Sequence, residues 1–257
     1  MKLLAKRFIS EIISNLHSIL SLIIKPKIGI RILMYHSINK SSKRLMDYND
    51  IFTVSLSSFE SQLISIVNSN YQVSSLDEII NDPNKNLAKL IITFDDGYHD
   101  NLINAAPLLI KYDFPFTIFI TTDNIGKPNY LSISDIKELS KYESVEIGSH
   151  GATHTPFTDL DNNSLINELV TSKSILEHIT NKKISIISYP HGLVNKAVIK
   201  EAELAGYKYA FSSRMGINKN LDDKYLLKRT TILSFDKDKQ FSQKLMGNWD
   251  WYGRLLK

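Results

Sequence analysis

The chain has 257 residues, of which 43% are hydrophobic and 23% charged, and its formal net charge is +4. These values are ordinary for a folded globular protein with a full apolar core, and the mild charge without a dense basic stripe argues against nucleic-acid binding. The chain has no cysteine, which excludes disulfides, thiolate metal sites and cysteine nucleophiles. Any metal ion must therefore be held by histidine and carboxylate ligands.

Residues 1–27 are predicted to form a basic amphipathic helix. Apolar side chains recur there at helical spacing, among basic residues and a single acid, Glu11. The segment lacks the roughly 20 apolar residues of a membrane span and the small-residue cleavage site of a secretory signal. The helix either lies on an anionic membrane surface or packs on the main domain. This pattern favours a cytoplasmic protein at the inner face of the membrane, with a periplasmic location left open.

Residues 28–257 are predicted to form a single α/β domain. The predicted strands are 30–36, 52–55, 90–94, 116–121, 145–148, 184–189, 209–212 and 228–233. The predicted helices are 58–68, 102–112, 134–141 (capped by Ser134), 163–179 and 196–205. This alternation implies parallel strands connected through helices, and about seven such units suit a closed or nearly closed barrel. In such barrels the functional side chains gather at the carboxyl ends of the strands.

Two adjacent carboxylates, Asp95 and Asp96, directly follow the apolar strand 90–94. Burying an unpaired carboxylate costs several kcal/mol, so these side chains need a partner, and a metal ion is a common one. His150 and His154 follow the strand 145–148. The four residues predict a site in which two histidines and one carboxylate hold a divalent cation. The second carboxylate is left free for proton transfer.

A facial triad of two histidines and one carboxylate also occurs in iron oxygenases. Those enzymes usually carry His-x-Asp on one strand, and they have no use for a second carboxylate beside the ligand. The pair Asp95 and Asp96 therefore argues against that class.

Three motifs resemble those of the polysaccharide deacetylase family, also called the NodB-homology domain or carbohydrate esterase family four. They are Thr-Phe-Asp-Asp-Gly at 93–97, His-Gly-Ala-Thr-His at 150–154 and Ser-Tyr-Pro-His-Gly at 188–192, in the order of the family. The resemblance covers roughly residues 30–235 and implies a distorted (β/α)7-type barrel. It also implies a hydrolase that removes acetyl from an N-acetylated amino sugar, in a polysaccharide or a lipid-linked glycan.

The resemblance implies a role for each matching residue. Asp96, His150 and His154 match the metal ligands, with zinc the expected ion and nickel, cobalt or iron as alternatives. Asp95 matches the general base that activates a metal-bound water, and the backbone N–H of His191 matches an oxyanion donor.

The chain departs from the family pattern in two places. Ser188 stands where the third motif usually has an arginine that contacts the base, and Arg229 is predicted to substitute for it. Many members of the family place the histidine that acts as general acid near the end of the domain, but no histidine follows His191 here. The proton for the leaving amine must therefore come from a residue earlier in the chain. His36 is the candidate, because it ends strand 30–36 as Asp95 follows its own strand. The sequence Leu-Met-Tyr-His-Ser-Ile at 33–38 also resembles the biofilm poly-N-acetylglucosamine deacetylase branch, which lacks the same arginine.

Three further side chains have open interpretations. Tyr98 and Tyr189 either stack on a sugar ring or pack at the barrel rim. His99, which follows the acidic motif, is a candidate to orient a metal ligand rather than to act itself. The functional alternative to an enzyme is a non-catalytic glycan-binding module that kept the fold.

Overall fold

The computed structural model describes residues 28–40, 51–82, 88–221, 223–251 and 253. The predicted helix over residues 1–27, and with it the expected membrane contact, lies outside these residues. Within the part of the chain that the structure describes, no helix has the length and apolar character needed to cross a membrane.

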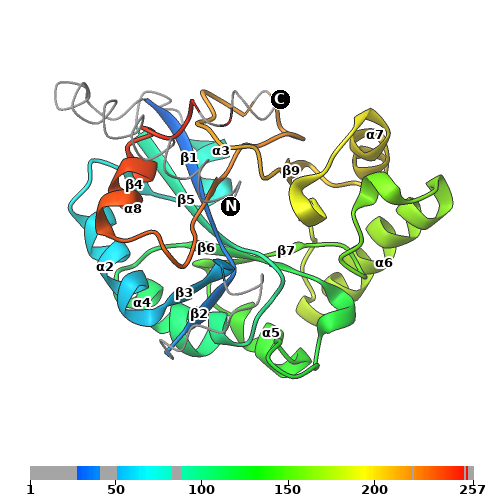
Figure 1. The fold of residues 1–257 in the computed structure, drawn as a ribbon. Helices are drawn as coiled ribbons and strands as arrows, with labels where there is room; N and C mark the ends of the chain where they lie inside the picture. Colours follow the sequence, from blue (N-terminus) through cyan, green and yellow to red (C-terminus); the bar gives the residue numbers. More distant parts are fainter. Residues whose placement is uncertain (1–27, 41–50, 83–87, 222, 252, 254–257) are drawn as a thin grey trace, which may run out of the picture.

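A parallel sheet forms the centre of the molecule (Figure 1). Its strands lie in the spatial order β10 (Thr230–Thr231), β1 (Gly29–Tyr35), β5 (Ala88–Phe94), β6 (Phe116–Ile120), β7 (Val145–Ser149), β8 (Ile186–Ser188) and β9 (Tyr209–Phe211). The short strand β4 (Gln72–Val73) pairs with the start of β5, and β2 (Ser37–Asn39) pairs separately with β3 (Thr53–Ser55).

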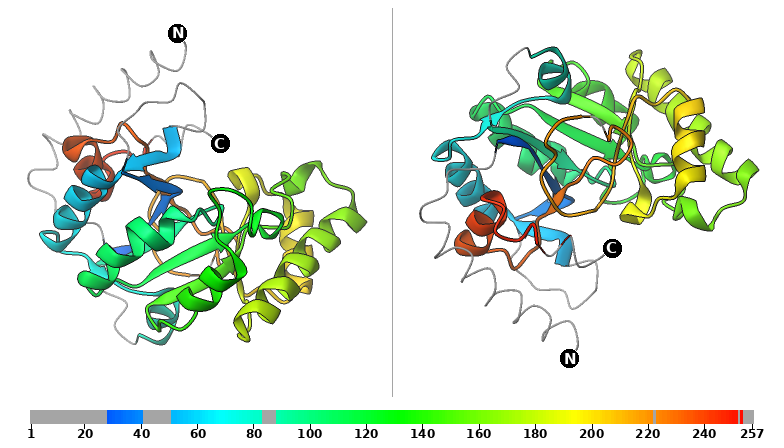
Figure 2. Two further views of the ribbon diagram at one scale, coloured as in Figure 1. Left: turned by 90° about the horizontal axis from the view of Figure 1, so that it is seen from below. Right: turned by 90° about the horizontal axis from the view of Figure 1, so that it is seen from above.

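Helices surround this sheet. They are α2 (Leu56–Val67), α3 (Leu76–Asn81), α4 (Ala106–Lys111), α5 (Ile133–Leu139), α6 (Asn162–Thr180), α7 (Lys196–Leu204) and α8 (Asp238–Leu245). Helices α2 and α8 pack together on one side of the molecule, and α6 and α7 pack together on the other (Figure 2). Short helical turns η2 (Asn101–Ala105), η3 (Thr122–Asn124), η4 (Phe157–Asp159) and η5 (Pro190–Gly192) lie in the connections.

The sheet curls until its two edge strands are linked by one segment. Leu227 forms a parallel bridge with Phe211 of β9, and Thr230 then pairs with Leu33 of β1. The predicted α/β barrel fold is therefore confirmed, as a curled parallel sheet. The last predicted strand is shorter than expected, because only Thr230 and Thr231 pair with β1 while Leu227 pairs with β9.

The central strands β1, β5 and β6 are buried on both faces. Ile30 and Ile32 of β1 belong to a small cluster with Phe119 and Phe211, whereas Leu33 belongs to the larger core beneath the helices. Successive side chains of a strand point to opposite faces, so the small cluster fills the barrel interior. Double burial explains why these strands read as continuous apolar runs rather than as alternating ones.

The structure corrects one helix boundary and adds two helices. Helix α5 is capped by Ser132 rather than Ser134: the Ser132 hydroxyl accepts from the N–H of Asp135, whose carboxylate accepts from the Ser132 N–H. This reciprocal pair is a capping box, which satisfies two otherwise unpaired helix donors. Helices α3 and α8 were not predicted, because α3 has six residues and α8 is mostly polar.

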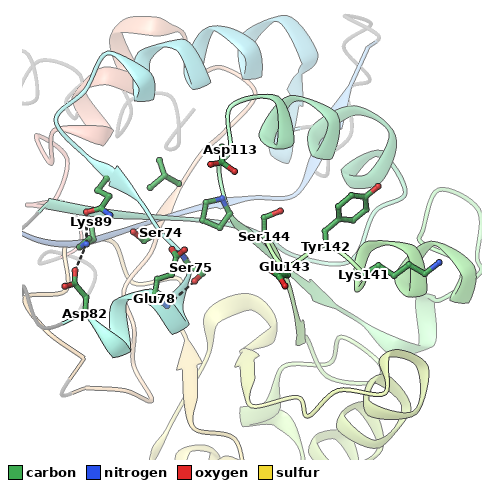
Figure 3. A pocket seen from close by; sticks show the side chains of 13 residues that line it. Ser74, Ser75, Glu78, Asp82, Lys89, Asp113, Lys141, Tyr142, Glu143 and Ser144 are labelled. Atoms are coloured by element: carbon green, nitrogen blue, oxygen red, sulfur yellow. Dashed lines mark hydrogen bonds and ion pairs between the residues drawn. The ribbon is translucent and has the colours of Figure 1, made fainter.

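An open groove of about 1060 Å³ lies at the amino ends of β4 and β5 (Figure 3). Lys89 on its wall binds Asp82 at 2.6 Å and Gln72 at 2.8 Å. Asp95 lies beyond the opposite, carboxyl end of β5. The groove is therefore separate from the predicted site.

Glu146 on β7 gives stability a testable pH dependence. It is partly buried, its carboxylate accepts from the Thr117 hydroxyl at 3.3 Å, and burial raises its pKa from 4.5 to about 7. A carboxyl whose pKa is higher in the folded state than in the unfolded state binds more protons when folded between these two values. Stability should therefore fall as the pH rises from about 4.5 to 7, by up to about 3 kcal/mol from this group.

We expect Glu146→Gln to be more stable than the wild type in urea unfolding at pH 8 and to lose that advantage at pH 4.5. The exposed neighbour Glu143 provides the control variant Glu143→Gln. An equal difference between wild type and Glu146→Gln at both pH values would contradict this expectation.

Candidate active site

The two adjacent carboxylates enter the same site because the chain turns between them. Asp95 continues the face of β5 that lines the barrel interior, and its N–H donates to the Tyr35 carbonyl at the end of β1. Neighbouring residues of a strand point to opposite faces, but Asp96 has a left-handed φ of 74°. Such a conformation is strained for a residue other than glycine and is typical of functional sites. The turn brings the Asp96 carboxylate back to the barrel mouth.

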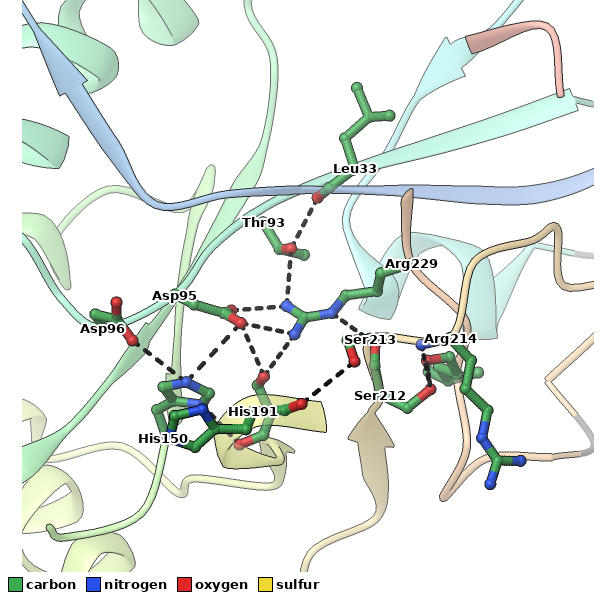
Figure 4. Close-up of polar contacts among 12 residues, drawn as sticks. Leu33, Thr93, Asp95, Asp96, His150, His191, Ser212, Ser213, Arg214 and Arg229 are labelled. Atoms are coloured by element: carbon green, nitrogen blue, oxygen red, sulfur yellow. Dashed lines mark hydrogen bonds and ion pairs between the residues drawn. The ribbon is translucent and has the colours of Figure 1, made fainter. Parts of the chain in front are cut away.

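Asp95 is held in a buried, two-pronged ion pair with Arg229 (Figure 4). Nη1 lies 2.7 Å from Oδ1, and Nη2 lies 2.7 Å from Oδ2. Other donor contacts of the guanidinium reach Ser188 Oγ at 2.7 Å, Thr93 Oγ1 at 3.3 Å and the Ser212 carbonyl at 3.0 Å. All three guanidinium nitrogens are therefore bound, which fixes the arginine and the carboxylate together.

The predicted contact between Arg229 and Asp95 is thus present in the structure. Ser188 is 0% exposed, and its hydroxyl also lies 3.2 Å from Asp95 Oδ2. A small residue at position 188 leaves room for the guanidinium that arrives from the segment before β10. The departure from the family motif at position 188 is therefore matched in space by Arg229.

These contacts set the protonation state of Asp95. Burial acts to raise the pKa of Asp95, but Arg229 and His150 outweigh it, and the net pKa lies below its ordinary value of 3.8. Asp95 is therefore a carboxylate at neutral pH, as a proton acceptor must be.

Asp96, His150 and His154 bring three ligand atoms within 4.8 Å of one another. Asp96 Oδ1 lies 3.4 Å from His150 Nε2 and 3.2 Å from His154 Nε2. Ligands about 2.0–2.1 Å from a tetrahedral zinc ion are about 3.3–3.4 Å apart, so this spacing fits such an ion. Asp96 Oδ1 is also buried without a hydrogen bond of ordinary geometry. The donor set and its spacing therefore fit a divalent cation.

His150 is oriented by its second ring nitrogen. Nδ1 lies 2.8 Å from the Ser188 carbonyl, which can only accept, so Nδ1 carries the proton and Nε2 faces Asp96. Burial lowers the pKa of His150, but Asp95 and Asp96 outweigh it, and the net pKa is raised. The two carboxylates thus make the position between the rings attractive to positive charge.

His36 lies at the mouth of the barrel beside this cluster. It directly follows β1, and its ring packs at 4.5 Å from the ring of Phe52. Burial lowers the pKa of His36, while Asp96 and Asp95 act in the opposite direction. Its Nδ1 is buried without a hydrogen-bond partner in the structure. His36, the candidate acid from the sequence, is therefore close enough for both carboxylates to affect its pKa.

Asn101 and Asn104 hold the chain around His36, and the sequence analysis missed both. The amide of Asn101 donates to the His36 carbonyl and that of Asn104 to the Ile38 carbonyl, each at 2.7 Å. Both asparagines are buried in the π-helical turn η2, a rare element that is frequent at functional sites.

The remaining predicted residues divide into two groups. His191 lies at the site: its ring is 4.7 Å from the ring of His154, and its φ of 58° is left-handed. Tyr98 lies at the rim, stacked on Tyr130 at 4.9 Å. Tyr189, in contrast, is 0% exposed and donates from its hydroxyl to a backbone carbonyl.

The suggestion that Tyr189 stacks on a sugar was therefore wrong, because its ring belongs to the core. His99 does not orient a metal ligand either. Its Nε2 lies 3.9 Å from Asp135, and its side chain is 41% exposed.

The loop with the two histidines rests on Glu168 of α6, which the sequence analysis also missed. This buried carboxylate accepts from the N–H groups of Ala152 and Thr153. The available signal was its position on the apolar face of the helix, between Leu165 and Leu169. A glutamate at such a position needs partners, and here the backbone of the loop supplies them.

A parallel α/β barrel with a carboxylate and two histidines at its mouth, beside a separate buried aspartate, defines a hydrolase-type site with a candidate metal centre. The polysaccharide deacetylase family model matches residues 82–210. The poly-beta-1,6-N-acetyl-D-glucosamine N-deacetylase of Staphylococcus aureus is 30% identical over 205 residues, which cover 72% of this chain and 69% of the relative.

The fold is shared with solved structures, among them two deacetylases. A polysaccharide deacetylase from Bacillus cereus has a TM-score of 0.74 and 29% identity, covering 84% of this chain and 69% of its own. The deacetylase PplD of Streptococcus pyogenes, solved in complex with acetate, has a TM-score of 0.75 and 25% identity, covering 86% and 99%. The chain belongs to the polysaccharide deacetylase family, whose enzymes are hydrolases acting on carbon–nitrogen bonds. The resemblance to the biofilm branch is likewise confirmed.

Proposed function

We propose that the protein hydrolyses the acetyl amide of an N-acetylated amino sugar, in a polysaccharide or a lipid-linked glycan. One divalent cation, zinc by preference, would be held by Asp96, His150 and His154. The observation that carries the proposal is the cluster of these ligand atoms within 4.8 Å, beside a buried Asp95 that is not part of it. The S. aureus relative, named for poly-N-acetylglucosamine, supports a hexosamine polymer as substrate.

A bound zinc ion supplies Lewis acidity, which polarises an acetyl carbonyl and lowers the pKa of water. Asp95 accepts the proton of the attacking water, and Arg229 keeps Asp95 ionised for this purpose. Asp95 Oδ2 lies 3.9 Å from His150 Nε2, so the base faces the ligand cluster. The backbone N–H of His191 would donate to the oxyanion that forms on the carbonyl oxygen of the acetyl group.

His36 would deliver a proton to the leaving amine, because an amide nitrogen leaves poorly without one. Its lowered pKa means that the resting imidazole is neutral at pH 7. The proton that Asp95 takes from the attacking water would then pass to His36 and from His36 to the amine, which returns both side chains to their resting states. Tyr98, stacked on Tyr130 at the rim, would lie against the sugar.

Metal removal tests this proposal. Dialysis against a strong chelator is expected to abolish acetate release, and stoichiometric zinc is expected to restore it. The substrate panel contains poly-N-acetylglucosamine, chitin oligomers and lipid-linked N-acetylhexosamines, with released acetate measured enzymatically. Asp96→Ala should lose activity, and added zinc should not restore it. The variant lacks the oxygen that lies near Nε2 of both His150 and His154.

Two outcomes would contradict the proposal. Acetate release that survives complete chelation would exclude a metal-dependent reaction. A zinc-loaded protein that binds a glycan but releases no acetate from any substrate would favour the non-catalytic binding module instead.

A further inference from the structure

We propose that Glu168 is a positioning residue that sets the affinity of the metal site, acting through the loop that carries His154. This inference rests on the proposed function for the identity of the ligands. Glu168 lies in α6 and is 5% exposed. Its carboxylate hydrogen bonds in the described part of the chain go to Ala152 and Thr153 and not to the three ligand side chains. Its effect would pass through the backbone.

The Glu168 carboxylate binds the loop at Ala152 and Thr153 through several short hydrogen bonds. Oε2 accepts from the N–H of Ala152 at 2.6 Å and from the N–H of Thr153 at 3.1 Å. Oε1 accepts from the Thr153 hydroxyl at 2.6 Å. Hydrogen bonds to an ionised acceptor are roughly twice as strong as neutral ones, so this one side chain anchors two consecutive residues.

The anchoring extends to both sides of His154. The Thr153 hydroxyl lies 2.7 Å from Thr155 Oγ1 and accepts from the Thr155 N–H at 3.2 Å. Glu168 therefore fixes the residue before His154 directly and the residue after it through one hydroxyl. His154 between them has a φ of 67°, a strained conformation that persists only where the surroundings over-determine it.

The opposite side of the loop is held by η3. The N–H groups of Thr122 and Asp123 donate to the carbonyls of Gly151 and Ala152, at 3.2 and 2.9 Å. The loop is therefore clamped between η3, which binds its carbonyls, and Glu168, which binds its N–H groups.

Close approach of Glu168 also explains a glycine in the motif. A Cβ at Gly151 would lie 3.0 Å from Glu168 Oε2 and 3.0 Å from the Phe157 ring, at a φ of +76°. A side chain at position 151 would thus push the carboxylate away from the loop.

The test compares zinc affinities of the purified full-length proteins, measured by competition with a chromophoric chelator. Glu168→Gln keeps the shape but turns one acceptor into a donor that faces other donors. We expect its zinc affinity to fall about 10- to 100-fold, the usual effect of losing a partner that orients a metal ligand. Thr153→Val, which removes only the hydroxyl, should lower the affinity by a smaller factor.

Glu177→Gln on the same helix is the matched control. Glu177 also accepts a backbone N–H, that of Ile184 at 3.0 Å, but it does not contact the His154 loop. The Glu177→Gln substitution should lower the melting temperature without changing zinc affinity. Should Glu168→Gln fail to fold, Thr153→Val against this control decides the question.

The outcomes separate this inference from the proposed function. Wild-type zinc affinity in both Glu168→Gln and Thr153→Val, where His154→Ala loses it, would overturn the inference and leave the function standing. Reduced affinity in these variants of a protein that releases no acetate would uphold the inference and overturn the function. A wild type whose zinc binding does not depend on His154 would overturn both.

Discussion

Asp95→Asn is expected to lower the rate of acetate release about 100- to 10,000-fold, the range that a positioned general base contributes. Asparagine has nearly the same shape but cannot take up the proton of the attacking water. Zinc affinity should change little, because Asp95 is not among the three clustered ligands. The measurement is kcat with saturating substrate and zinc, together with chelator competition for the metal.

The substitution also leaves Arg229 without its charge partner, so some stability should be lost. Asp250→Asn controls for this effect. Asp250 forms a buried two-pronged pair with Arg31, at 3.0 and 2.9 Å, between the C-terminal segment and β1. The Asp250→Asn variant should lose comparable stability and keep the wild-type rate of acetate release. Unchanged acetate release by Asp95→Asn would remove Asp95 from the role of base.

Arg229→Met is expected to destabilise the protein by about 3–5 kcal/mol, because it leaves the Asp95 carboxylate buried without a partner. It should also change the pH dependence of activity. Arg229 is the main group that lowers the pKa of Asp95 against the effect of burial. Without it only His150 and His36 oppose burial, so the pKa of Asp95 rises and the acidic limb of the kcat/KM profile moves to higher pH.

The dependence of stability on pH should weaken as well. In the wild type the depressed pKa of Asp95 contributes stability that is complete above its ordinary value of 3.8 and is lost as the pH falls through the folded value. In Arg229→Met the pKa of folded Asp95 is expected to be higher than in the wild type, so the stability that Asp95 contributes above pH 3.8 is expected to be smaller. Urea unfolding between pH 3 and 8 measures both trends.

Arg31→Met is the matched control for Arg229→Met, since Arg31 has the same buried, two-pronged geometry outside the site. It should cost similar stability and leave the pH profile of activity in place. Arg229→Lys should recover only part of the loss, because one ammonium cannot bind both oxygens of Asp95 together with Ser188 and Ser212. An unshifted acidic limb in Arg229→Met would show that Arg229 does not tune the base.

Local sequence was enough to predict most of the strands and the chemistry at their ends. Apolar runs of β-favouring residues stop abruptly at Asp95 and His150, and parallel strands collect such ends at one mouth. The helix cap at Ser132 and the short helix α3 were missed, although both carry a serine followed three residues later by an acid. The position of Tyr189 was misjudged because neighbouring residues at the end of a strand point in opposite directions. A shift of one residue decides whether a side chain faces the barrel mouth or the core.

The sequence by itself determined the class of fold, the candidate ligands Asp96, His150 and His154 with the neighbouring Asp95, and the candidate acid His36, because each lies within or beside a local motif. Only the tertiary structure showed how Arg229, a candidate from the sequence, binds Asp95, and that Glu168 supports the histidine loop. Arg229 lies 134 positions from Asp95, and Glu168 reaches the histidine loop from the face of a helix. Closing the sheet and packing α6 on it create these contacts, and no local pattern records partners that meet only when the barrel has formed.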